Sequence, residues 1–90
     1  MNNNLKKIYK HFGFNNQFCK LKEEFNELLF ELFDNNREKI VEEMADLEVV
    51  LDQFKIKHKI TELELSCIKR AKIERTIERI ESGYYKNCEE

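Results

Sequence analysis

The chain has 90 residues, a formal net charge of −2, two glycines, no proline and a charged fraction of 38%. One domain of this length has a marginal hydrophobic core on its own, and the scarcity of turn residues argues against a sheet protein. The charge balance shows no basic bias toward nucleic acid, and the hydrophobic content is too high for a disordered chain. We therefore expect one all-α domain over residues 1–90.

The N-terminus carries no signal for export or membrane insertion. The segment Met1–Lys7 has no apolar core, and no long apolar run follows, so we expect a cytoplasmic protein without a membrane partner. The cysteines, Cys19, Cys67 and Cys88, are odd in number and form no C-x-x-C pair. Reduced thiols fit this pattern, with Cys19 and Cys67 as small core residues and Cys88 in a frayed tail.

The first half of the chain predicts two helices. Residues 5–12 have helical apolar spacing, and Gly13 is a plausible stop. Asn15 or Asn16 then caps a longer helix that runs to about Phe33.

The segment Asp34-Asn35-Asn36 is a turn signal, so we expect the following helix to fold back antiparallel. Asn35 or Asn36 caps that helix, which runs to about Lys57. Thr61 and Glu64 have the form of a capping box and open a last helix, which Gly83 ends.

Two acidic pairs lie on the central helices. Glu24 with Glu27, and Glu43 with Asp46, are spaced i, i+3, so each pair presents its carboxylates to one side of a helix. Antiparallel helices would bring the four acids together, where they repel each other unless a cation lies among them. Hard divalent ions such as Mg²⁺ prefer such oxygen ligands.

The central helices also carry apolar stripes, which we expect to form the core. The stripes are Leu21, Phe25, Leu28 and Leu32 on the first, and Ile40, Met44, Leu47, Leu51 and Phe54 on the second. Glu43 falls inside the apolar sector of its helix, with Asp46 at the edge. Because buried carboxylates need a partner, a proton or a metal, the pattern favours a metal site for Glu43 over the alternative, a solvated face.

The second central helix, which is predicted to end at about Lys57, is apolar on another side as well. That side holds Val41, Ala45, Val49 and Ile56. A helix that is apolar nearly all round is normally central, and this chain offers few neighbours to surround it. We expect a second subunit to cover part of this surface. The alternative is that the first and last helices cover all of it.

The ordered acids and their flanks resemble a known family. The segment Asn16–Glu24 is similar to an N-Q-hydrophobic-x-K-L-x-E-E lead-in, and Glu42–Asp46 to an E-E-hydrophobic-A-D motif. Together they resemble the MazG-like all-α nucleoside triphosphate pyrophosphohydrolases. The tail, Lys72–Ile80 with Gly83–Tyr85, is similar to short members from phages and prophages of Gram-positive bacteria. The resemblance covers nearly the whole chain.

The resemblance implies a fold and an activity. The fold would be an antiparallel bundle of about four helices, completed by a homo-oligomer, either a dimer or a tetramer. The activity would be hydrolysis of a nucleoside triphosphate between the α and β phosphates, with Mg²⁺, or alternatively Mn²⁺, as cofactor. The implied catalytic and metal-binding residues are Glu24, Glu27, Glu43 and Asp46.

A polyphosphate substrate also needs cations from the protein. Lys72, Arg75 and Arg79 form one basic stripe on the last helix, and Arg presents a planar fork suited to phosphate oxygens. Gln17 and Lys20 lie one to two turns before Glu24, within reach of the phosphates or base. The alternatives are a solvated stripe and plain surface positions.

A different class of function also fits the pattern, namely a non-catalytic helical interaction or regulatory module. In such a module the acids would face solvent. A di-iron carboxylate bundle is excluded, because it needs E-x-x-H motifs and neither histidine follows a glutamate at that spacing.

Overall fold

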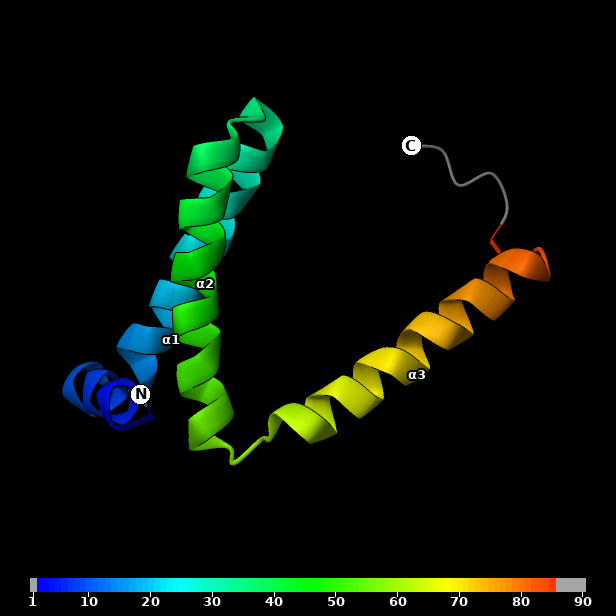
Figure 1. Cartoon of the computed structure of the whole chain (residues 1–90). Helices are drawn as coiled ribbons and strands as arrows, with labels where there is room; N and C mark the ends of the chain where they lie inside the picture. The colour runs from blue at the N-terminus through cyan, green and yellow to red at the C-terminus, as the bar shows by residue number, and fades with distance from the viewer. Residues whose placement is uncertain (1, 86–90) are drawn as a thin grey trace. The chain divides into compact units, whose positions relative to one another are not determined.

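The computed structural model describes residues 2–85, which form three α-helices and no strand. Helix α1 spans Asn2–Asp34, α2 spans Arg37–Lys57 and α3 spans Glu62–Glu81 (Figure 1). This confirms the all-α class. The chain divides into two units, with the boundary between Lys59 and Ile60. None of the described helices is both long and apolar enough to cross a membrane.

The helical conformation breaks at Gly13, where the sequence predicts a stop, and α1 consists of two helical segments that meet there at a bend. Gly13 has φ 83° and ψ 168°, a conformation that is open to glycine and costly for other residues. The predicted new N-cap at Asn15 or Asn16 is wrong. The Asn16 side chain donates from Nδ2 to the Phe12 carbonyl at 2.6 Å, so it satisfies an acceptor on the far side of the bend.

The turn between α1 and α2 follows the sequence closely. Asn35 adopts a left-handed conformation with φ 60°, which asparagine tolerates better than most residues. Asn36 is the N-cap of α2, and its side chain accepts from the Lys39 backbone N–H at 3.3 Å. The two helices then run side by side in opposite directions (Figure 1).

The most deeply buried residues of α1 and α2 are mostly polar. The four least exposed residues are Glu24 and Gln53 at 2%, Val50 at 4% and Gln17 at 5%. The predicted core stripes are instead largely accessible: Phe25 is 51% exposed. The physical reason is that each stripe is wider than one neighbouring helix can cover, and α2 turns its Val50–Gln53 face toward α1.

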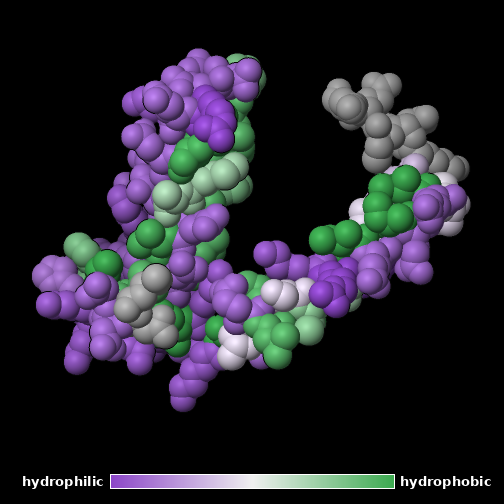
Figure 2. Space-filling view, viewed as in Figure 1, coloured by the Kyte–Doolittle hydropathy of each residue, from purple (hydrophilic) through white to green (hydrophobic). Residues whose placement is uncertain are grey.

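Much apolar surface therefore stays accessible on the described residues, as the green areas of Figure 2 show. An apolar groove on the α1–α2 hairpin is lined by Phe18, Leu21, Lys22, Phe25, Leu47 and Leu51. Cys19 and Cys67 are also exposed free thiols, so their prediction as core residues is wrong. Cys88 lies outside the described residues.

Helix α3 begins and ends where the sequence predicts. Thr61 is its N-cap and accepts from the Glu64 backbone N–H at 3.1 Å. After the helix, Gly83 takes φ 79°, and the Tyr84 N–H bonds to the Arg79 carbonyl at 2.8 Å. This left-handed closure is typical of a glycine-terminated helix.

Candidate metal centre

The antiparallel register of α1 and α2 aligns the polar residues of the two helices. Gln17 on α1 donates from Nε2 to Oε1 of Gln53 on α2 at 2.7 Å. Glu24 follows Gln17 by seven residues, and Asp46 precedes Gln53 by seven. Two turns of helix return a side chain to nearly the same face, so both acids lie on the side that faces the partner helix.

Three of the four predicted acids converge. One carboxylate oxygen from each of Glu24, Glu27 and Glu43 lies within 4.8 Å of the others. We call these residues the carboxylate trio. Asp46 lies outside the trio, but it lines the same groove as Glu24.

The trio contains buried oxygens that lack a protein partner. Glu24 Oε1 pairs with Lys20 Nζ at 3.0 Å, whereas Glu24 Oε2 is buried without a hydrogen bond among residues 2–85. Glu43 Oε2 is likewise buried without a hydrogen bond among these residues. A buried polar atom without a partner is costly and calls for an explanation such as a bound ion or water.

The proton affinity of Glu43 reflects this crowding. Burial is the largest cause that raises its pKa, to about 7, from an ordinary value of 4.5. A hydrogen bond with Glu27, which protonated Glu43 makes, and the negative charges of Glu27, Asp46 and Glu24 raise it further. A cation at this point would offset the same repulsion.

The donor set fits a hard divalent ion. All three trio ligands are carboxylates, and Mg²⁺ typically binds through one or two carboxylates together with water and substrate phosphates. Lys20 compensates one of the negative charges: Glu24 raises the pKa of Lys20 through a hydrogen bond and its charge. Glu24, Glu27 and Glu43 are therefore the residues that would hold the ion.

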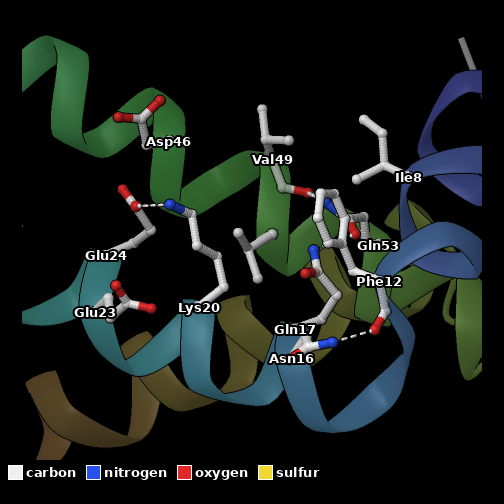
Figure 3. Close-up of a pocket in the computed structure, with 11 residues that line it drawn as sticks. Ile8, Phe12, Asn16, Gln17, Lys20, Glu23, Glu24, Asp46, Val49 and Gln53 are labelled. Carbon is white, nitrogen blue, oxygen red and sulfur yellow. Dashed lines mark hydrogen bonds and ion pairs between the residues drawn. The ribbon is translucent and has the colours of Figure 1, made fainter.

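A groove of about 500 Å³ opens beside the trio, between α1 and α2 (Figure 3). Pockets for small ligands span roughly 300–1,000 Å³. The lining residues are Ile8, Phe12, Asn16, Gln17, Lys20, Glu23, Glu24, Asp46, Val49, Val50 and Gln53. The groove thus has charged groups around Glu24 and apolar groups around Phe12.

Gln53 is a groove residue that sequence reasoning missed. It is almost fully buried and contacts the predicted residue Gln17. The available signal was its position seven residues after Asp46 on the same helix. A lone glutamine at that spacing is a weak signal, because most such residues face solvent.

The predicted substrate-binding residues divide between the two units. Gln17 and Lys20 line the groove in the first unit. Lys72 and Arg75 are exposed on α3, in the second unit. The Arg79 guanidinium lies 4.9 Å from the centre of the Tyr84 ring, so Arg79 already has an aromatic partner.

Comparison of the chain with protein-family models, with curated proteins and with solved structures gives no match.

The raised pKa of Glu43 predicts how stability depends on pH in metal-free protein. Between its unfolded value of 4.5 and its folded value of about 7, the folded state holds a proton that the unfolded state has lost. The contribution of Glu43 to the free energy of unfolding is therefore largest at low pH and declines as pH rises through about 7. Replacing Glu43 by Gln should remove this decline, so the variant gains stability relative to the parent as pH rises.

Urea denaturation in EDTA, from about pH 4 to about pH 8 so that the range spans both pKa values, measures the difference in stability between variant and parent. Glu42→Gln is the matched control, because Glu42 is the exposed neighbour on the same helix, and its difference from the parent should stay constant with pH. A Glu43→Gln difference that is equally constant would contradict the predicted titration.

Proposed function

We propose that the chain is a Mg²⁺-dependent nucleoside triphosphate pyrophosphohydrolase, with Mn²⁺ as an alternative ion. The substrate is a ribo- or deoxynucleoside triphosphate, and the products are the monophosphate and pyrophosphate. The observation that supports this most is the carboxylate trio, which has two buried oxygens without a hydrogen bond among residues 2–85 and whose member Glu24 lines a groove of nucleotide size. The resemblance to MazG-like enzymes points to the same reaction, in the cytoplasm of a phage-infected or lysogenic cell.

The ion would supply charge compensation for the triphosphate and for the attacking water. Glu24, Glu27 and Glu43 would hold the ion, with Glu24 at the wall of the groove. Lys20, which is paired with Glu24 Oε1, adds a positive charge on the phosphate side. Asp46 faces the groove outside the trio, so its carboxylate is available to accept the proton that the attacking water releases.

The basic stripe of α3 would provide further charge for the phosphates. Lys72 and Arg75 are exposed, and a guanidinium can bind two phosphate oxygens at once. Arg79 is the weakest member of the predicted set, because its guanidinium is stacked on Tyr84.

The accessible apolar surface supports assembly into a homo-oligomer, at least a dimer, which would complete a helical bundle. Val50 is the one large apolar residue that is buried among the described residues, which is too little for a stable lone core. The apolar groove around Phe25 and Leu51 would be the contact. The same surface favours the alternative function, a non-catalytic interaction module.

A substrate panel tests the reaction. Incubation with Mg²⁺ and each of the ribo- and deoxynucleoside triphosphates should release equal amounts of monophosphate and pyrophosphate. Replacing Glu24 or Glu27 by Gln should lower kcat by at least about 100-fold, since each change removes an ion ligand. Glu42→Gln is the control and should keep parent activity. Absence of turnover for every nucleotide would leave the interaction module as the better reading.

The role of the basic stripe is tested by Arg75→Ala. We expect kcat/KM to fall by about one to two orders of magnitude, because a charge-assisted contact contributes roughly 1.5–3 kcal/mol. Stability should change by no more than about 0.5 kcal/mol, as for other surface sites. Lys69→Ala, an exposed lysine of α3 off the stripe, is the control. Unchanged kinetics in Arg75→Ala would remove it from the substrate site.

Light scattering tests the assembly. The parent should give a dimer or tetramer mass at micromolar concentration. Phe25→Asp should shift the mass toward the monomer, because a buried charge without a partner is costly at a contact. Asn26→Asp, at the exposed next position, should keep the parent mass. A monomer mass for the parent would contradict assembly and would mean that the chain covers its own apolar surface.

A further inference from the structure

Two glutamine side chains meet in the groove about two helical turns from Glu24 and Asp46. Gln17 and Gln53 are almost fully buried and hydrogen-bonded to each other, and both line the groove. They are the two glutamines of the chain. An apolar pair would bridge α1 and α2 at lower desolvation cost, so the polarity of this contact suggests a use beyond packing.

The hydrogen bonds fix which way each amide points. The Val49 backbone oxygen can only accept, so the Gln53 atom that lies 3.3 Å from it is the nitrogen Nε2. The Gln53 oxygen Oε1 then faces Gln17 and accepts at 2.7 Å, which requires the Gln17 nitrogen on that side. One backbone carbonyl therefore sets the orientation of both amides.

The orientation leaves a defined pattern for a molecule in the groove. Beyond its bond to Gln53, the Gln17 amide has one further N–H donor and the lone pairs of Oε1. Donor and acceptor hold fixed places, because rotating the Gln17 amide by half a turn would set its oxygen against the Gln53 oxygen. A free glutamine would present either arrangement equally well.

The position of Gln17 suits contact with a nucleobase. Gln17 precedes Glu24 by seven residues, which is about 10 Å along a helix and on the scale that separates the base of a nucleotide from its phosphates. Phe12 and Ile8 line the groove beyond Gln17 and supply apolar contact (Figure 3). A triphosphate held at the trio would thus extend its base toward Gln17.

We propose that Gln17 contacts the nucleobase and that Gln53 is a positioning residue which locks the polarity of that contact; this rests on the proposed nucleotide substrate. Keto bases present a ring N–H beside a carbonyl, whereas amino bases present a ring nitrogen acceptor beside an NH₂ group. The donor and acceptor exchange places between the two classes. A locked amide matches one class in a given pose and opposes the other, so the groove discriminates keto from amino bases.

The experiment measures this discrimination in two ways. The first is the dissociation constant, by calorimetry with Mg²⁺, of the α,β-imido analogues of UTP and CTP, and of GTP and ATP. The second is kcat/KM for the four nucleotides. The parent should favour one member of at least one pair by about tenfold or more, as for other bidentate base contacts. Gln53→Met should reduce that ratio to less than about threefold, because Gln17 can then turn.

Two further variants separate positioning from plain structure. Leu28→Ala shortens a half-buried apolar side chain of α1 that does not line the groove, so it should lower stability and keep the parent ratio. Gln17→Met should abolish the ratio without any change at Gln53. If Gln53→Met does not fold, the Gln17→Met result alone decides whether Gln17 contacts the base.

The outcomes distinguish this inference from the proposed reaction. Discrimination between analogues without turnover would support the base contact and overturn the hydrolysis. Turnover with a parent ratio below about threefold in both pairs, on the same scale, would overturn the base contact alone. A Gln53→Met or Gln17→Met protein that keeps the parent ratio between nucleotides would also overturn the base contact. Failure of all analogues to bind would overturn both.

Discussion

The antiparallel register between α1 and α2 is the constraint on which the candidate site depends. The turn at Asn35 and Asn36 starts α2 at a fixed residue. Polar residues of α2 therefore lie opposite polar residues of α1. Gln17 meets Gln53, and Glu27 meets Glu43. A slip of one residue would rotate each side chain of α2 by about 100° relative to α1 and would separate both pairs. The trio and the groove exist because one turn sets this alignment.

The α1–α2 hairpin holds its acids close together against their mutual repulsion. Glu24 is offset by Lys20 on one oxygen only, and Glu43 responds by retaining its proton up to about pH 7. Such strain is tolerated in proteins where a ligand or ion relieves it. The polar interior between α1 and α2 is thus better suited to binding a charged group than to stabilising two helices on their own.

The hairpin has two different sides as a result. One side is the groove with Glu24, Asp46 and Gln17, and the other is the apolar groove around Phe25 and Leu51. Polar side chains occupy the narrow strip between the helices, so the wide apolar stripes lie beside it. Under the proposed function, stability would come from a second subunit that covers those stripes, and chemistry from the substrate that enters the groove around Glu24. Assembly and function would be coupled through the same two helices.

The sequence by itself determined the helices, their caps at Asn36 and Thr61, the closure at Gly83 and the i, i+3 spacing of the acids. These features depend on backbone sterics and on hydrogen bonds within a few residues, which local sequence specifies. Only the tertiary structure decided which helix faces are buried. It therefore also decided that Gln53 is buried and that the apolar stripes are exposed. That choice depends on how much surface each neighbouring helix can cover, which is a sum over distant residues that no local pattern contains.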